Sequence, residues 1–358
     1  MADIDKLMEQ GISNRAFPGA VVLIARHGVI VKDSAYGYAE LYTDDKFHRS
    51  LHPLPMRRDT LFDLASLSKL FTTTAVMKLW EEGRLRLDNP VASYIPAFAV
   101  NGKAKVTVRM LLTHTSGLPS SLPLWKESGA REKRLASVYS LPLQHSPGAV
   151  YEYSDLNFIV LGALVETVSG QRLDVFIQRN ITGPLGLADT MYDPPPQLKQ
   201  RIAATEYQTS AHRGLVWGQV HDENAYALGG VAGHAGVFST ASDLAVFAQM
   251  ILGGGTYDGH QILKPQTVQA MEANQVMPQA REHALGWELD QPWYMGALAS
   301  PETMGHTGFT GTSLVIDPSL DLIVILLTNR VHPTRTGPSL NPYRQQLADL
   351  IAQSIDGS

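Results

Sequence analysis

The sequence contains no cysteine among its 358 residues. Disulfide bonds, thiolate nucleophiles and cysteine-based zinc sites are therefore excluded. Residues 1–6 lack the basic and apolar regions of a secretory signal, and no apolar run is long enough to span a bilayer. We therefore expect a cytoplasmic protein with no membrane partner, or an exported one if a signal peptide was removed.

A strong excess of charge of one sign is also missing. The formal net charge is −5, with 18% charged and 44% apolar residues. This balance gives no electrostatic reason to expect nucleic acid as a partner, and it is typical of a globular chain with a sizeable core. The length favours one large domain or two closely packed subdomains.

Apolar periodicity predicts strands near both ends of the chain and helices between them. Apolar runs at 20–25 and 29–31 flank His27-Gly28 and predict a β-hairpin, and runs at 312–316 and 322–328 flank a second turn. Helical periodicity is found in residues 5–16, 66–80, 106–113, 156–168, 242–252 and 342–355. This order predicts a sheet assembled from the two termini and interrupted by a helical insertion.

Ser66 and Lys69 stand three residues apart at the start of a predicted helix. Residues i and i+3 share a helix face, so both side chains point the same way. A serine hydroxyl becomes nucleophilic when a neighbour takes its proton, and lysine can do so if burial lowers its pKa enough to keep it neutral. The alternative is a helix-capping serine beside a solvated lysine, because this pattern occurs roughly once by chance in such a chain.

Two further segments carry residues suited to the same chemistry. Tyr153, in Tyr153-Ser154-Asp155, can relay protons if it lies beside a lysine; alternatively it is a half-buried residue that opens the next helix. In His306-Thr307-Gly308 the glycine would let a substrate lie against the strand, and the N–H of Phe309 could complete an oxyanion hole with that of Ser66. The alternative there is a strand-start histidine followed by a turn glycine.

Taken together, these motifs stand in an order that is found in one family. The sequence resembles the penicillin-recognising serine hydrolases, namely class C β-lactamases, DD-carboxypeptidases and the esterases built on the same fold. The family shows S-x-x-K, then Y-x-N, then K/H-T-G, with similar gaps. Further stretches agree: FPGA at 17–20, LFDLAS at 61–66, LLTHTSGL at 111–118 and GHTGFTG at 305–311.

The resemblance implies roles for individual residues. Ser66 would be acylated, and Lys69 and Tyr153 would share the general-base and general-acid work, with the first base left open. The backbone N–H groups of Ser66 and Phe309 would hold the oxyanion. Substrate binding would fall to His306, Thr307, Gly308 and Asp155.

The resemblance also implies an α+β fold of the β-lactamase/transpeptidase type. We expect an antiparallel sheet flanked by helices plus a mostly helical region. The expected sheet region comprises residues 1–60 and 225–358, with the helical region at 61–224 inserted between them. No metal and no cofactor is predicted.

Two departures from the family pattern affect substrate binding. Asp155 stands where the family often has asparagine, and an ionised carboxylate cannot donate to a substrate carbonyl; one alternative is that Asp155 pairs with Lys69 and keeps it charged. His306 stands where β-lactamases usually carry lysine. Because histidine is partly charged near neutrality, we hypothesise a weak preference for carboxylate-bearing substrates that is lost as the pH rises from about 6 to 8.

Several other residues have competing interpretations. The stretch His221-Asp222-Glu223-Asn224, before the glycine-rich run at 229–236, could bind a metal, but a loop bordering the cleft is preferred because H-E-x-x-H is absent. His114 is expected to be structural, with its ring satisfied by the backbone. Trp287, Trp293 and Tyr294 could line an acyl pocket or pack in the core.

The function predicted from these features is a carboxylesterase-like hydrolase acting through an acyl-enzyme. It rests on the complete Ser66, Lys69 and Tyr153 set, on the departures at His306 and Asp155, and on the absence of an export signal. The alternatives are a DD-carboxypeptidase or D-amino-acid peptidase, a weak β-lactamase, or a penicillin-binding protein without turnover. The substrate would be a small ester, amide or lactam, acyl transfer to another acceptor stays open, and no oligomeric state is assigned.

Overall fold

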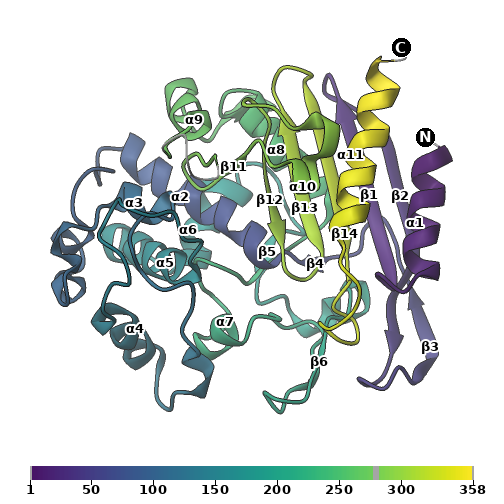
Figure 1. Ribbon diagram of the computed structural model, residues 1–358, viewed down its shortest axis with the longest axis horizontal. Helices are drawn as coiled ribbons and strands as arrows, with labels where there is room; N and C mark the ends of the chain where they lie inside the picture. Colours follow the sequence, from purple (N-terminus) through teal and green to yellow (C-terminus); the bar gives the residue numbers. More distant parts are fainter. Residues whose placement is uncertain (1, 277–281, 357–358) are drawn as a thin grey trace.

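Figure 1 shows the computed structural model, which describes residues 2–276 and 282–356. Its central feature is a seven-stranded antiparallel sheet in the order β11-β12-β13-β14-β1-β2-β3. The first strand of the chain therefore pairs with the last. The strands are β1 Gly19–Arg26, β2 Val29–Tyr42, β3 Arg49–Pro55, β11 Glu288–Leu289, β12 Met304–Gly308, β13 Thr312–Asp317 and β14 Leu322–Thr328.

The β1–β2 hairpin is closed by a two-residue turn. His27 and Gly28 both have positive φ, at 52° and 71°, and the ladder resumes with Arg26 opposite Val29. Such a turn matches the twist of its flanking strands but requires two left-handed residues, a conformation that glycine adopts without cost. The predicted hairpin is confirmed, although β2 continues to Tyr42.

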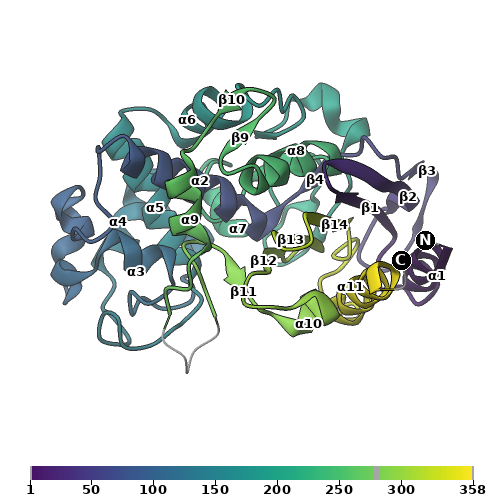
Figure 2. The same cartoon turned by 90° about the horizontal axis from the view of Figure 1, so that it is seen from above.

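Alternate residues of β1 face two different hydrophobic cores. Val21 and Leu23 pack with the core around the inner helices, whereas Val22 and Ile24 pack against the terminal helices α1 and α11. This alternation is the period of two that a strand imposes on its side chains. Figure 2 shows α10 and α11 on one side of the sheet and α8 on the other.

Eleven α-helices lie in the described part of the chain. Their bounds are α1 Ala2–Ser13, α2 Ser68–Glu81, α3 Val108–Leu112, α4 Arg131–Ser140, α5 Asp155–Ser169, α6 Leu173–Ile177, α7 Glu223–Ala227, α8 Ala241–Leu252, α9 Pro265–Glu272, α10 Pro292–Met295 and α11 Asn341–Asp356. No helix within residues 2–276 or 282–356 combines the length and apolarity that a membrane crossing requires.

Short strands and turns connect these helices. The small sheets contain β4 Phe62–Asp63, β8 Val237–Ser239 and β5 Met191–Tyr192; β6 Tyr207–Gln208 and β7 Gly214–Leu215; and β9 Thr256–Tyr257 and β10 His260–Gln261. The 3₁₀ turns are η1 Ala65–Leu67, η2 Val91–Ser93, η3 Pro96–Ala99, η4 Lys103–Lys105, η5 Leu124–Lys126, η7 Pro196–Arg201 and η8 Gly296–Leu298, and η6 Gln178–Thr182 is a π turn.

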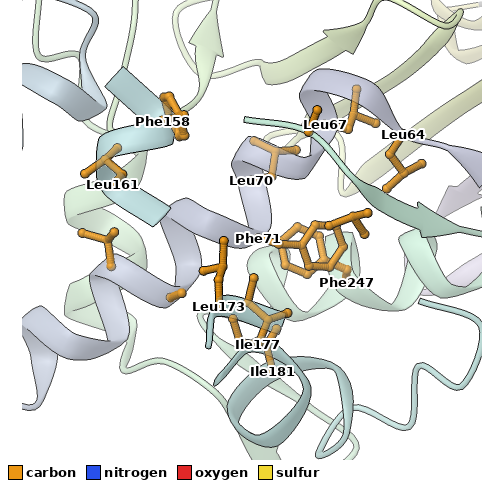
Figure 3. Close-up of a cluster of buried hydrophobic side chains, with 14 of the residues drawn as sticks. Leu64, Leu67, Leu70, Phe71, Phe158, Leu161, Leu173, Ile177, Ile181 and Phe247 are labelled. Carbon is orange, nitrogen blue, oxygen red and sulfur yellow. The ribbon is translucent and has the colours of Figure 1, made fainter. Parts of the chain in front are cut away.

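Helix α2 is the centre of the inner core. Residues 68–77 are all buried, as expected of a helix that is surrounded by protein over most of its length. Figure 3 shows Leu64, Leu67 and Leu70 above the stacked rings of Phe71 and Phe247, whose centroids are 4.5 Å apart. The turn that precedes α2 therefore rests on a closely packed apolar base.

The predicted α+β fold with an antiparallel sheet is confirmed. The helix predicted at 106–113 is shorter than expected and begins only after Thr107, whose hydroxyl caps it by accepting from Met110 N. Trp287 and Tyr294 are buried in the two cores, and Trp293 packs against the outer one, which supports the packing interpretation of these aromatics. The boundaries 1–60, 225–358 and 61–224 stay a prediction.

Candidate active site

The turn before α2 presents Ser66 to solvent. Between Leu61 and Leu70, Ser66 is the one residue that is not buried. It lies in the 3₁₀ turn η1, directly after Ala65, which has a left-handed φ of 48°. A non-glycine residue in this region is strained and persists only where its surroundings hold it. Here the Asp63 side chain accepts a hydrogen bond from Ala65 N at 2.9 Å.

Lys69 is buried directly below Ser66. Its Nζ donates to Ser66 Oγ at 3.0 Å, to Asp155 Oδ1 at 2.8 Å and to the carbonyl oxygen of His234 at 3.3 Å. Three acceptors satisfy the three protons of an ammonium group. The predicted proximity of Ser66 and Lys69 is therefore present, and the Asp155 carboxylate comes from a helix 86 positions away in the sequence.

The charge of Lys69 is decided by two opposing effects. Burial alone favours the neutral amine, but the Asp155 carboxylate, assisted by Tyr153, outweighs it and raises the pKa of Lys69. Lys69 is therefore an ammonium in the resting site. The sequence-based condition that burial would keep this lysine neutral is therefore wrong. The structure instead contains the alternative, a pair between Lys69 and Asp155.

Tyr153 covers the lysine and is itself held between histidines. Its ring centroid is 4.9 Å from Lys69 Nζ and 4.5 Å from the ring of His114. Burial raises the pKa of Tyr153, although hydrogen bonding with Lys69 and Ser66 acts in the opposite direction. The phenol is thus protonated at neutral pH and can serve as a proton donor next to Ser66.

His114 is buried and contacts the backbone as expected, but only through Nδ1, because Nε2 has no hydrogen-bond partner among the described residues. Its Nδ1 accepts from Ser154 N at 3.0 Å and lies 3.2 Å from Asn157 Nδ2. Ser116 Oγ donates to Asn157 Oδ1 at 2.6 Å. Desolvation holds the pKa of His114 well below its usual range, so the ring is neutral. These contacts orient the start of α5, which carries Asp155 toward Lys69, and the segment directly before it, which carries Tyr153.

The end of β12 packs against the turn η1, which carries Ser66 and is called the nucleophile turn below. A Cβ on Gly308 would lie 2.1 Å from Thr312 Oγ1 and 2.4 Å from the carbonyl oxygen of Leu64, so only glycine fits there. Thr307 is half-buried on the same strand and Phe309, directly after it, is exposed. Within the described part of the chain, the N–H groups of Ser66 and Phe309 have no hydrogen-bond partner, as an oxyanion hole requires.

His306 is neutral, contrary to the hypothesis of a partly charged side chain. Burial, reinforced by the nearby Lys69 charge, lowers the pKa of His306 to about 3. Its Nδ1 lies 2.8 Å from the carbonyl oxygen of Thr307, and its ring is 6.0 Å from that of Tyr153. Its charge therefore does not change between pH 6 and 8, and a carboxylate preference that fades in this window has no structural basis.

The histidines in and after the possible metal-binding segment contact carboxylates at hydrogen-bond distance. His234 Nε2 is 2.8 Å from Asp222 Oδ1, and His221 Nε2 is 2.8 Å from Glu206 Oε2. Among residues 2–276 and 282–356, no group of three or more histidine or acidic side chains is placed to hold a metal ion. The main-chain carbonyl of His234, in the glycine-rich run at 229–236, instead accepts a hydrogen bond from Lys69. The sequence predicted a loop bordering the cleft but not this contact.

Comparison with known proteins is consistent across the whole chain. Residues 4–349 match the family model described as β-lactamase. A protein of Escherichia coli (strain K12), provisionally named a D-alanyl-D-alanine carboxypeptidase, is 36% identical over 94% of this chain and 84% of its own length. An N-acetylmuramyl-L-alanine amidase of Bacillus subtilis (strain 168) is 34% identical over 95% and 83%.

Solved structures share the fold at lower sequence identity. A class C β-lactamase from Rhodobacter sphaeroides superposes with a TM-score of 0.77 at 24% identity, covering 99% of this chain and 100% of that one. EstCE1, a hydrolase with promiscuous acyltransferase activity, gives a TM-score of 0.77 at 24% identity, covering 97% of each chain. These two likenesses concern the fold alone.

Proposed function

The chain belongs to the β-lactamase family, and we propose that it hydrolyses an amide bond of cell-wall peptides, with D-alanyl-D-alanine ends as the substrate class. The observation that carries the proposal is the contact of the Lys69 ammonium with both Ser66 Oγ and Asp155 Oδ1. The provisional name of the E. coli relative supports the substrate class. The carboxylesterase interpretation has weaker support, since EstCE1 shares the fold at 24% identity.

The proposed reaction begins with a proton transfer from Lys69 to Asp155 across their 2.8 Å contact. The resulting amine takes the proton of Ser66 while Oγ attacks the substrate carbonyl carbon. The N–H groups of Ser66 and Phe309 hold the oxyanion. Exclusion of water by the bound substrate favours the first transfer, because it makes a desolvated ion pair less stable relative to the neutral pair.

Expulsion of an amine requires an acid, and Tyr153 is suited to this step. A departing amine must be protonated as the carbon–nitrogen bond breaks. The Tyr153 phenol donates that proton and regains one from Lys69, which in turn regains its own from Asp155. The acyl-enzyme on Ser66 is then hydrolysed by water with the same groups, which restores the resting site.

A second candidate is cleavage of an internal amide, as the name of the B. subtilis relative describes for that protein. The specific observation in its favour is the neutral state of His306, whose pKa burial lowers to about 3. A neutral side chain offers no full charge to the terminal carboxylate of a D-alanyl-D-alanine substrate. An internal amide carries no such carboxylate next to the scissile bond.

The test compares the purified protein with Ser66→Ala on four substrates. These are diacetyl-L-lysyl-D-alanyl-D-alanine, its L-alanyl-L-alanine counterpart, N-acetylmuramyl-L-alanyl-D-isoglutamine and p-nitrophenyl butyrate. We expect release of D-alanine, lost in the variant, with kcat/KM at least about 10-fold above that for the L-alanyl-L-alanine peptide, a difference of about 1.4 kcal/mol.

The other outcomes assign the alternatives. Cleavage of the muramyl peptide alone would select the amidase. Hydrolysis of the p-nitrophenyl ester alone would return the assignment to an esterase. A stable benzylpenicillin adduct at Ser66, detected by intact mass without turnover of any substrate, would identify a penicillin-binding protein.

A further inference from the structure

A buried carboxylate outside the reacting groups joins the parts of this site. We propose that Asp63 is a positioning residue that holds the nucleophile turn, the oxyanion turn and the loop before α7 in one fixed arrangement. The inference rests on the proposed function in taking Ser66 as the nucleophile. It does not depend on which substrate is cleaved.

The first contact of Asp63 is with the nucleophile turn. Its Oδ1 accepts from Ala65 N at 2.9 Å, and Ala65 is the residue with left-handed φ directly before Ser66. A left-handed alanine costs about 1–3 kcal/mol and needs support from its surroundings. The carboxylate supplies that support at the peptide group that must rotate if the turn relaxes. The direction of Ser66 Oγ therefore depends on Asp63.

The second contact is with the loop that helps to hold Lys69. Asp63 Oδ2 accepts from His221 N at 2.5 Å, at the start of the segment that leads to the Asp222–His234 pair. The carbonyl of His234 is one of the three acceptors of Lys69 Nζ. The Asp63 carboxylate thus links the nucleophile turn to the loop before α7, and both segments lead to contacts with Lys69.

The third contact reaches the oxyanion turn. The main-chain carbonyl of Asp63 accepts from Thr310 Oγ1 at 2.7 Å, and the next carbonyl, of Leu64, accepts from Thr312 Oγ1 at 2.9 Å. Both threonines closely follow Phe309: Thr310 lies in the turn after β12 and Thr312 begins β13. The N–H of Ser66 therefore lies three residues after Asp63 in the chain. The N–H of Phe309 lies next to Thr310, which is hydrogen-bonded to Asp63.

The chemistry of the site requires a carboxylate at this position. Two backbone N–H groups point at the side chain, and an asparagine has only one acceptor oxygen, so its amide NH₂ would face the second donor. Asp63 is 2% exposed, and among the described residues no basic side chain pairs with it. A buried carboxylate without a basic partner destabilises the folded state. Its presence here is explained if its geometry serves catalysis.

The experiment measures hydrolysis of p-nitrophenyl butyrate by the wild type, Asp63→Asn and Asp243→Asn well below their melting temperatures. Asp243 is a matched control because its carboxylate also accepts a backbone N–H, from Asp189 at 2.9 Å, at the start of α8. We expect Asp63→Asn to lower kcat about 100-fold with KM within about twofold, as loss of oxyanion stabilisation does. The control should keep both parameters.

A second readout separates positioning from simple loss of folded protein. A phenylboronic acid forms a tetrahedral adduct with the serine and needs both oxyanion donors, so its affinity should fall in parallel with kcat. Loss of folded protein would lower the number of boronate-binding sites per protein molecule but leave the dissociation constant of the boronate unchanged. If Asp63→Asn does not fold, Thr310→Val removes one tie only, and we expect it to lower kcat about 10-fold.

The outcomes distinguish the two proposals. A folded Asp63→Asn variant with wild-type kcat and boronate affinity would overturn the positioning role and leave the proposed function intact. Failure of Asp63→Asn to fold together with unchanged kcat in Thr310→Val would overturn it as well. A wild-type protein that never reacts at Ser66 would overturn the proposed function and this inference with it.

Discussion

The Nζ of Lys69 lies 2.8 Å from Oδ1 of Asp155, and the lysine side chain is completely buried while the aspartate side chain is 30% exposed. The pair keeps Lys69 charged, and it makes Asp155 the nearest acceptor for the proton that Lys69 must release before it can act as a base. The departure from the family asparagine at this position thus has a chemical consequence.

Replacement of Asp155 by asparagine tests this consequence. The amide keeps the shape of the side chain but cannot take a proton, so kcat/KM should fall about 100-fold across pH 6 to 9, the scale of a lost general base. Steady-state kinetics over that range provide the measurement. Activity at or above that of the wild type would mean that loss of the carboxylate simply frees a neutral lysine.

The control for Asp155→Asn is Glu166→Gln on the same helix. Glu166 pairs with Arg131 at 2.9 Å and accepts from Leu173 N at 3.1 Å, away from Lys69. The same carboxylate-to-amide change should leave kcat/KM within about twofold, because this pair is partly exposed and contributes little.

Gly308→Ala should damage the site by steric overlap. The added methyl group would meet Thr312 Oγ1 and the Leu64 carbonyl at distances far below van der Waals contact, which would push β12 away from the nucleophile turn. We expect a loss of about 1–3 kcal/mol in the free energy of unfolding and of at least about 100-fold in kcat. Urea denaturation and ester hydrolysis measure the two effects, and Gly337→Ala, whose Cβ meets nothing closer than 3.8 Å, should cause neither.

Buried neutral histidines should make the protein sensitive to acid. Burial lowers the pKa of His306 to about 3 and that of His283 and His332 to about 4, below the usual 6.5. Between about pH 4 and 6.5 these histidines bind protons in the unfolded chain but not in the folded chain. The free energy of unfolding therefore rises with pH in this range and falls as the pH is lowered from about 6.5 toward 4. Each histidine contributes a slope of about 1.4 kcal/mol per pH unit.

Urea denaturation at intervals between pH 4 and 7.5 measures this slope. His332→Gln, which removes one such group outside the candidate site, should make the curve shallower by the slope of one histidine. His260→Gln, at an exposed position, should leave the curve unchanged. A stability that stays flat between pH 4 and 6.5 would contradict the expectation.

Phe71→Ala should destabilise the base on which the nucleophile turn rests. Phe71 is completely buried and stacks on Phe247, so its truncation leaves a cavity that costs about 3–5 kcal/mol. Urea denaturation should show this loss, whereas Leu51→Ala, at a position that is 92% exposed, should change the unfolding free energy by less than about 0.5 kcal/mol. A Phe71→Ala loss below about 1 kcal/mol would mean that the core collapses around the gap.

Local periodicity in the sequence was sufficient to predict several elements of this protein. The alternation in β1 determines which side chains face each core, and His27-Gly28 predicts the hairpin turn. The i, i+3 spacing places Ser66 and Lys69 together because the geometry of a helix turn is nearly independent of its surroundings. The ordered motifs then predict the fold through their resemblance to one family.

Protonation states and supporting contacts were decided only by the tertiary structure. Two of the three acceptors of Lys69 come from residues 86 and 165 positions away, and Asp63 contacts Thr310 across 247 positions. The sequence could suggest a charged His306 or a neutral Lys69, but a pKa depends on desolvation and on charges from distant segments. Those effects exist only once the chain has folded, which is why the sequence predicts candidate reacting residues whereas their protonation states depend on the fold.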